Sequence, residues 1–261
     1  MTVTKIFITN KSGMKLAGVW SIPKQPTDKA IILAHGITGD KDEVGIFTDL
    51  ANLLKRNNFA VFRFDFRAHG ESTGRSVDMT ITGEMEDVKA ALNEVKNRGY
   101  KNIGLLGASF GGGISALFVS DYQTEFKCLC LWNPTLNYYH CYLSPTKTSI
   151  RKFKAHIKNE VAKQGWAYLY GNTFKIGKAL LEEMKYLSPY KALKKIGIPT
   201  VIIHGTKDKS VPYEDSKKYI NNLKGINEFV TIKGSGHGFH GQPYSTQAQT
   251  ATLKFFQQYL Q

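Results

Sequence analysis

The sequence predicts an α/β fold in which a mostly parallel central sheet carries helices on both faces. Short apolar runs rich in β-branched residues alternate with longer segments of helical periodicity along most of the chain. The runs are apolar on both faces, as the strands of a covered parallel sheet are. A length of 261 residues suits one domain of this class, so we expect residues 1–261 to fold as a single unit.

Eight apolar runs have the composition of strands. The first two lie close together in the sequence, and we expect them to form an antiparallel hairpin at one edge of the sheet. The remaining six alternate with helical segments, which favours parallel pairing. The predicted strands are Lys5–Thr9, Leu16–Ile22, Ala30–Ala34, Ala60–Asp65, Ile103–Leu106, Lys127–Leu131, Pro199–His204 and Phe229–Lys233.

Helices are predicted between these runs. Asp40 and Glu43 have the spacing of a capping box and precede an apolar face that includes Phe47. An apolar stripe from Ile81 to Val95 predicts a second helix, and the last helix is expected from about Thr246 to Tyr259. The pattern therefore predicts helices that cover the sheet, spread along the whole chain.

The stretch from Thr135 to Gly197 interrupts the alternation. It has no clear strand pattern, but helical patterns cover Ile150–Lys163 and Phe174–Tyr186. A structureless loop of this length is uncommon inside a compact domain. We therefore expect residues 135–197 to form a helical insertion that lies over the sheet as a lid.

Positive charge is concentrated in the same insertion. The chain has 35 Lys and Arg residues against 21 Asp and Glu residues, and residues 135–197 hold twelve of the basic ones and three of the acidic ones. Such a balance first suggests nucleic-acid binding, but no motif of the usual nucleic-acid-binding folds occurs, and we expect no such partner. A lysine-rich run is typical of a solvated helix face, and it is also suited to attracting an acidic substrate, an acyl carrier or anionic lipid.

The chain has the features of a cytoplasmic protein that needs no cofactor or metal. No apolar run approaches ~18 residues, so no transmembrane helix is expected. Met1–Asn10 lacks the charged and apolar regions of a secretory signal. The three cysteines lack metal-ligand spacing, and Cys128 and Cys130 fall on one face of a predicted strand, so we expect buried thiols in a reducing compartment. The oligomeric state is left open.

A Gly-x-Ser-x-Gly pattern covers residues 107–111, with Ser109 at its centre. The pattern directly follows a predicted strand and directly precedes the small residues of a predicted helix start. A sharp turn between a strand and a helix exposes a serine hydroxyl above a sheet. The sequence therefore predicts that Ser109 is a nucleophile.

A serine nucleophile needs a base, and the base needs an acid that orients it. His237 lies between two glycines just after the last predicted strand and is the expected base, with His240 as its rival. Asp208 follows the preceding strand and is the expected acid, because polar groups at the carboxyl ends of parallel strands meet at one edge. Asp215 is less favoured, because it falls within the next predicted helix.

An oxyanion needs preorganised backbone N–H donors. The residue after the nucleophile, Phe110, is one expected donor, and Ile37 in the loop after the third predicted strand is the other. His35 in that loop is expected to be a structural hydrogen-bonding group rather than a proton carrier. The polar loop Asp65–Ser72 could hold substrate, but a cluster of hydrogen bonds that stabilises the loop is the favoured interpretation.

These motifs, in this order and spacing, resemble the α/β-hydrolase superfamily, and the resemblance covers the chain outside the insertion. The segments around residues 35–41, 63–66 and 79–88 are similar to bacterial cinnamoyl and feruloyl esterases and to serine aminopeptidase-like and monoacylglycerol-lipase-like hydrolases. Three positions depart from the esterase pattern: Ala108 and Phe110 flank the serine where histidine and glutamine are common, and Ala68 replaces a usual glycine. The resemblance implies an α/β-hydrolase fold with a helical lid.

The residues and the resemblance together predict a serine esterase that acts on short- to medium-chain or aryl esters through an acyl-enzyme on Ser109. A thioesterase or an amide or peptide hydrolase with the same residues is the alternative, and a non-catalytic binding protein is a further one. The aromatic residues of the insertion are expected to pack it onto the sheet or to line a pocket for acyl or aryl groups. They are Tyr138, Tyr139, Tyr142, Trp166, Tyr168, Tyr170 and Phe174.

Overall fold

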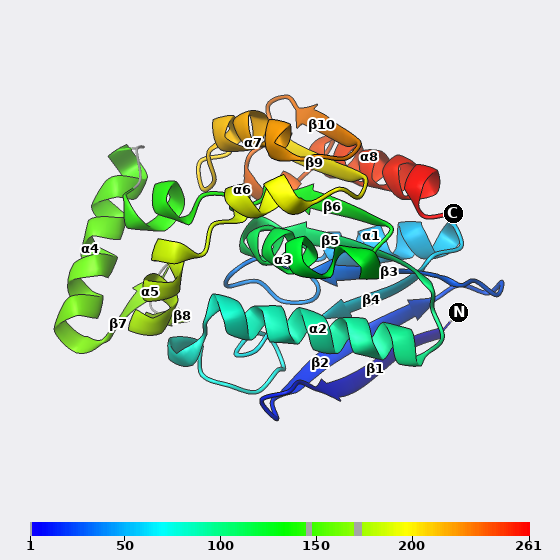
Figure 1. The fold of residues 1–261 in the computed structure, drawn as a ribbon, viewed down its shortest axis with the longest axis horizontal. Coiled ribbons are helices and arrows are strands. Elements are labelled where there is room, and N and C mark those ends of the chain that lie inside the picture. Colours follow the sequence, from blue (N-terminus) through cyan, green and yellow to red (C-terminus); the bar gives the residue numbers. More distant parts are fainter. Residues whose placement is uncertain (1, 145–147, 170–173) are drawn as a thin grey trace.

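One eight-stranded sheet organises the molecule (Figure 1). The computed structural model describes residues 2–144, 148–169 and 174–261. The strand order in the sheet is β1-β2-β4-β3-β5-β6-β9-β10, and each of the eight predicted strands lies in it. The strands are β1 (Thr2–Thr9), β2 (Lys15–Ile22), β3 (Lys29–Ala34), β4 (Ala60–Phe64), β5 (Asn102–Ala108), β6 (Cys128–Trp132), β9 (Thr200–Gly205) and β10 (Asn227–Ile232).

The sheet is parallel except at one edge. β1 pairs antiparallel with β2, and β2 pairs antiparallel with β4. All other neighbours, from β4 across to β10, are parallel. The predicted fold class and the edge hairpin are confirmed. Because parallel strands point the same way, the loops after β3, β5, β9 and β10 meet at one end of the sheet.

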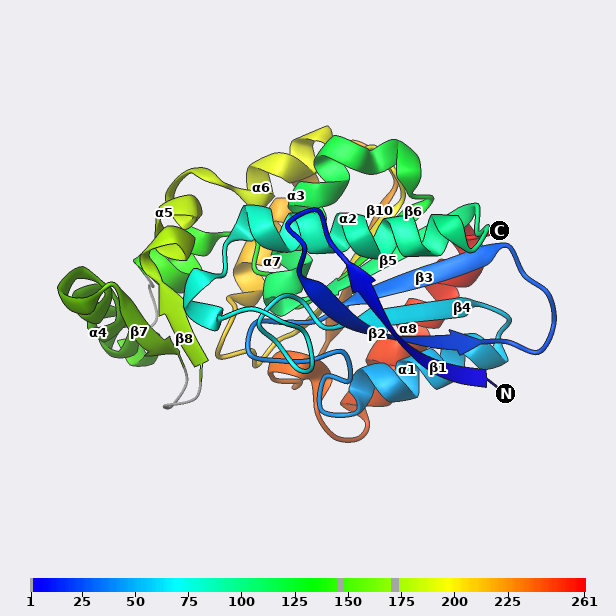
Figure 2. The ribbon, with the colours of Figure 1, turned by 90° about the horizontal axis from the view of Figure 1, so that it is seen from below.

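Helices cover both faces of the sheet (Figure 2). α1 (Ile46–Arg56) and α8 (Tyr244–Tyr259) pack on one face, and α2 (Ile81–Asn97) and α3 (Ser109–Tyr122) pack on the other. The alternation of side chains along β3 separates the two cores: Ile31 and Leu33 join the first, and Ile32 and Ala34 join the second. Two short helices, α6 (Pro189–Ala192) and α7 (Tyr213–Tyr219), complete the cover.

The predicted capping box before α1 is wrong. Asp40 Oδ1 accepts the N–H groups of Asp42 at 2.8 Å and Glu43 at 3.1 Å, but these bonds close a turn and not a helix. Glu43, Val44 and Gly45 then have φ angles of 44°, 54° and 89°, which no right-handed helix accommodates. The helix therefore begins only at Ile46, and the Glu43 carboxylate is free to bind elsewhere.

The insertion contains strands as well as helices. It consists of a π-helical turn at Tyr139–Leu143, α4 (Thr148–Gln164), the antiparallel hairpin β7 (Trp166–Leu169) and β8 (Phe174–Gly177), and α5 (Lys178–Tyr186). The expectation of a strand-free insertion is wrong, and the helix predicted over Phe174–Tyr186 begins only at Lys178. Each strand has four residues, which is too short for its period to stand out from the neighbouring helical pattern.

The insertion lies at the end of the sheet opposite both chain termini (Figures 1 and 2). Its buried residues Ile157, Val161, Leu180 and Met184 belong to the same apolar cluster as the α2–α3 side of the sheet. Cys128, Cys130 and Cys141 are buried. Within the described ranges, no helix has the length and the apolar composition needed to cross a bilayer.

Candidate active site

Ser109 occupies a sharp turn between β5 and α3. Its φ angle is 52°, a left-handed conformation that side chains larger than glycine rarely adopt. Two glycines allow the backbone to close around it. A Cβ atom on Gly111 would lie 2.1 Å from the His35 carbonyl oxygen, and one on Gly107 would lie 2.3 Å from Ser115 Oγ. The turn thus packs directly against the loop that follows β3.

Ser109, His237 and Asp208 are connected by hydrogen bonds. His237 Nε2 lies 2.9 Å from Ser109 Oγ, and His237 Nδ1 lies 2.7 Å from Asp208 Oδ2. The three side chains come from the end of β5, the turn after β9 and the 3-10 turn His237–Phe239 after β10. The parallel strand order brings these distant segments together, and the arrangement lets a hydroxyl pass its proton to an oriented imidazole.

The two rival residues lie elsewhere. Asp215 in α7 approaches His140 Nδ1 at 3.2 Å, and not His237. Among the described contacts, no hydrogen bond connects His240 with Ser109 or Asp208. The geometry therefore favours His237 and Asp208 over these alternatives.

Asp208 is held by backbone and side-chain donors. Its Oδ1 accepts the N–H groups of Ser210 and Val211, each at 2.8 Å. Its Oδ2 also contacts His204 Nε2 at 3.1 Å. Burial on its own would raise the pKa of this carboxyl, but the hydrogen bonds from His204 and His237 outweigh burial and hold its pKa well below the ordinary value. Asp208 is therefore a carboxylate over the whole physiological pH range.

His204 is a residue that sequence reasoning missed. It is fully buried on β9, with Nδ1 2.8 Å from Ser216 Oγ on α7 and Nε2 directed at Asp208. The Asp208 carboxylate has no proton to give, so Nε2 carries a proton and donates it to this carboxylate. Its position four residues before Asp208, inside an apolar strand, was the available signal, but a lone strand histidine has many structural explanations.

The two expected oxyanion donors flank Ser109 and are free of internal acceptors. Among the described residues no acceptor bonds the N–H of Ile37 or of Phe110, and Phe110 precedes the hydrogen-bonded ladder of α3. A small pocket of about 110 Å³ opens at this point. It is lined by Ile37, Thr38, Ser109, Cys141, Tyr142, Ser210, Val211 and His237.

The loop that carries Ile37 is fixed by buried groups on both sides. His35 Nε2 accepts the Phe66 N–H at 3.0 Å, and His35 Nδ1 donates to the Gly36 carbonyl at 2.8 Å. His35 is thus neutral and structural, with burial lowering its pKa to about 4. On the far side, His69 Nε2 accepts the Thr38 N–H at 3.3 Å.

Glu43 supplies a further contact to the same loop. Its Oε1 accepts the Gly36 N–H. A Cβ atom on Gly36 would lie 3.2 Å from this oxygen and 3.0 Å from Ser109 Cβ, so the carboxylate and the serine approach the glycine together. Burial raises the pKa of Glu43, against opposing effects of the Gly36 hydrogen bond and of His237. Glu43, which was predicted to cap a helix, therefore holds the backbone of the loop next to Ser109 instead.

The polar loop Asp65–Ser72 is an internal hydrogen-bond cluster. Asp65 accepts from the Lys41 backbone at 2.7 Å, from Lys41 Nζ at 3.0 Å and from the Glu71 N–H at 2.9 Å. Arg67 pairs with the buried Asp87 at 2.8 Å. These bonds join the polar groups of the loop to one another and to neighbouring residues, as the favoured interpretation of a loop-stabilising cluster expects.

No metal-binding cluster of three or more His, Cys, Asp or Glu side chains occurs in the described part of the chain.

Comparison with known proteins places this geometry among hydrolases. Residues 25–166 match the family described as serine aminopeptidase, S33. The uncharacterized protein YfhR of Salmonella typhimurium is 26% identical over 97% of this chain and 80% of its own length. A putative esterase/lipase 2 of Mycoplasma genitalium is 22% identical over 89% of this chain and 91% of its own length.

Solved structures show the same fold. Est1E of Butyrivibrio proteoclasticus, in a structure with ferulic acid bound, superposes with a TM-score of 0.82 and 22% sequence identity. The match covers 97% of this chain and 98% of Est1E. The likeness extends over the insertion as well as the sheet, because nearly all of both chains is included.

We predict that the free energy of unfolding falls as the pH is lowered from 6.5 towards 4. Burial lowers the pKa of His35 to about 4 and, with the neighbouring His35, lowers that of His69 to about 3, both from 6.5. In this window the unfolded chain binds protons that the folded chain does not, so stability is lost at about 1.4 kcal/mol per pH unit for each histidine.

Urea unfolding of the wild type and of His69→Gln at several pH values tests this. In the variant, the slope of the unfolding free energy against pH should be smaller by the contribution of about one proton. His156→Gln, which changes an exposed histidine of α4, is the control. Equal slopes for His69→Gln and the wild type would contradict the assignment of a buried neutral His69.

Proposed function

The chain belongs to the serine aminopeptidase S33 family of α/β-hydrolases, and from this premise we propose that it is a serine esterase acting on carboxylic esters through an acyl-enzyme. The coarser statement, an α/β-hydrolase of esterase/lipase type, follows from the family and the relatives. The observation that carries the finer proposal is the hydrogen-bonded series Ser109–His237–Asp208, at 2.9 Å and 2.7 Å.

In the proposed first half-reaction, Ser109 Oγ attacks the ester carbonyl carbon while His237 Nε2 takes the hydroxyl proton. Asp208 keeps the Nδ1 proton in place and stabilises the imidazolium. The carbonyl oxygen becomes an oxyanion that accepts from the N–H groups of Ile37 and Phe110. His237 then returns its proton to the leaving alkoxide, the C–O bond breaks, and the acyl group remains on Ser109.

In the second half-reaction, water replaces the alcohol. His237 takes a proton from the water, the hydroxide adds to the acyl carbon, and the same two N–H groups hold the second oxyanion. Collapse of this intermediate breaks the bond to Ser109, which regains its proton from His237. The acid leaves, and the enzyme returns to its starting state without any cofactor.

The surroundings of the site favour esters with apolar acyl or aryl groups. Cys141, Tyr142 and Val211 give the small pocket an apolar wall. The insertion, residues 135–197, contributes part of that wall, so we propose that it acts as a lid that selects the substrate. Relatives described as an esterase/lipase and a structure with ferulic acid bound are consistent with acyl and aryl groups respectively.

Amide and thioester hydrolysis by the same residues is the second candidate. The family description, serine aminopeptidase, favours testing an amide. An aminopeptidase must accept a positively charged amino terminus, but the cavity beside the site contains Lys158, Lys178 and Lys185 against the single acid Glu182. Positive charge there repels such a substrate, so we place esters first.

We predict that Ser109→Ala lowers kcat for p-nitrophenyl esters by about a thousandfold or more, because it removes the attacking oxygen. The melting temperature should change little. Ser120→Ala, at the far end of the same helix, is the control and should keep full activity. An ester panel from acetate to palmitate, with methyl hydroxycinnamates, an acyl thioester and an amide, identifies the preferred bond. Turnover that persists in Ser109→Ala would exclude this nucleophile.

His237→Ala should lower kcat by about 10²–10⁴, because the general base is lost. His240→Ala should have a much smaller effect, since no bond connects His240 to Ser109 in the described structure. Steady-state kinetics on one good ester compares the two. A larger loss of kcat in His240→Ala than in His237→Ala would identify His240 as the base.

Glu43→Ala should lower kcat about tenfold or more with a smaller change in KM, because the Gly36 N–H loses a charged acceptor next to the proposed oxyanion loop. Glu43→Gln keeps an acceptor oxygen and should recover most of the rate. Melting temperatures separate this effect from loss of folding. Equal losses in the two variants would show that the hydrogen bond is not what positions the loop.

A further inference from the structure

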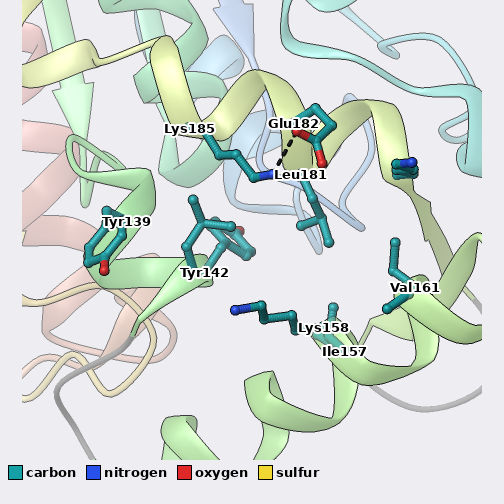
Figure 3. Close-up of a pocket in the computed structure, with 11 residues that line it drawn as sticks. Tyr139, Tyr142, Ile157, Lys158, Val161, Leu181, Glu182 and Lys185 are labelled. Atoms are coloured by element: carbon teal, nitrogen blue, oxygen red, sulfur yellow. Dashed lines mark hydrogen bonds and ion pairs between the residues drawn. The ribbon is translucent and has the colours of Figure 1, made fainter.

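The insertion encloses a second and larger cavity. It has a volume of about 540 Å³ and lies between the π-helical turn, α4 and α5 (Figure 3). The buried side chains Ile157 and Val161 from α4 and Leu181 from α5 form an apolar floor. Tyr139, Tyr142, Leu143, Ala162 and four charged residues complete the lining. The space is large enough for an aliphatic chain.

Tyr142 lies between this cavity and the pocket at Ser109. The same side chain lines both spaces, and it is only 8% exposed. Its neighbour Cys141 also lines the small pocket, and Leu143 lines the large one. The two spaces are thus neighbours, and a substrate arm that reaches from Ser109 into the insertion has to displace or pass the Tyr142 side chain.

The charged residues of the cavity leave an excess of positive charge. Lys185 Nζ is 2.6 Å from Glu182 Oε2, and Lys178 acts on the same carboxylate from further away. Lys158 has no ion pair or hydrogen bond with any residue of the described ranges. In Figure 3 its side chain extends from α4 into the cavity towards Tyr142. One carboxylate thus faces three ammonium groups, and among the described contacts only Lys185 pairs with it directly, while Lys158 lies on the opposite helix, α4.

We propose that this cavity binds the anionic end of an amphiphilic substrate, an ester with an apolar arm that ends in a carboxylate or a phosphate. The apolar arm lies on the floor of Ile157, Val161 and Leu181, and the anionic group pairs with Lys158. Lys158 is an exposed residue with no ion pair in the described part of the chain, so an incoming anion meets its charge directly and the attraction is partly screened by water and salt. This inference rests on the proposed esterase activity and defines the class of ester.

The occupant follows from charge complementarity and shape together. A neutral lipid chain would fill the floor but leave Lys158 unpaired. A small free anion would pair with Lys158 but leave the apolar floor exposed to water, which is unfavourable. An amphiphilic anion satisfies both. It also gives a reason for the position of a basic segment beside a hydrolytic site.

The test compares two esters of the same chain length, p-nitrophenyl octanoate and the mono-p-nitrophenyl ester of octanedioic acid. The wild type should prefer the anionic ester in kcat/KM by about tenfold or more, and Lys158→Gln should remove most of that preference. Lys194→Gln changes an exposed lysine outside the cavity and should keep it. A preference for the neutral ester, or the same preference in Lys158→Gln as in the wild type, would overturn the inference.

A third ester with a terminal phosphate distinguishes the two anions. The larger drop in kcat/KM on Lys158→Gln identifies which group the cavity accepts. Raising the ionic strength should weaken the preference in the wild type, because salt screens the pairing.

A binding measurement separates this inference from the proposed function. Ser109→Ala and Ser109→Ala/Lys158→Gln are titrated with decanoate and with decanol by calorimetry. Decanoate that binds at least tenfold more tightly than decanol, with Lys158 required, supports the cavity even if no ester is cleaved. Turnover of neutral esters without any role for Lys158 in binding would leave the esterase proposal standing and refute the cavity proposal.

Discussion

Close backbone packing at the turn between β5 and α3 is the constraint on which the site depends. Ser109 adopts a left-handed conformation that costs free energy for any residue with a Cβ atom. The missing side chain of Gly111 lets the turn approach the loop after β3 within contact distance, and that of Gly107 lets β5 pack against the first turns of α3. One close approach therefore positions both the hydroxyl of Ser109 and the Ile37 loop. A larger side chain at Gly111 would separate the two.

Buried polar residues stabilise this arrangement because each has a defined partner. Asp208 is surrounded by two backbone N–H groups and two histidines. The Ile37 loop is held by His35 and Glu43 and, through Thr38, by His69. Removing these groups from water is costly, and the hydrogen bonds offset that cost only in one geometry. The network thus favours a single conformation of the loops, which is what preorganised N–H donors require.

The insertion adds its own side chains to the surroundings of the site, beside those from the loops of the sheet. Its packing shares the apolar cluster of α2 and α3, so it is built onto the core rather than attached by linkers. Of its aromatic residues, Tyr138 packs against Phe110 at 5.3 Å, Phe174 packs against His69 at 4.8 Å, and Trp166 lies under Lys175 at 4.0 Å. Tyr139 and Tyr142 instead line the larger cavity, while Tyr170 lies outside the described residues. Some of these rings therefore pack the insertion onto the rest of the protein, and others line a cavity.

The sequence by itself determined the fold class, the eight strands and the identity of the residues around Ser109. Its signals were local: apolar runs, a glycine-rich turn and a polar residue just after a strand. It did not determine the role of Glu43, the participation of His204 or the β7–β8 hairpin. The strands of the hairpin are too short for their period to stand out, while the roles of Glu43 and His204 depend on how the backbone folds back on itself, so that Glu43 meets Gly36 and His204 meets Ser216. Only the tertiary structure decided them, because a side chain's partner is set by packing and not by its neighbours in sequence.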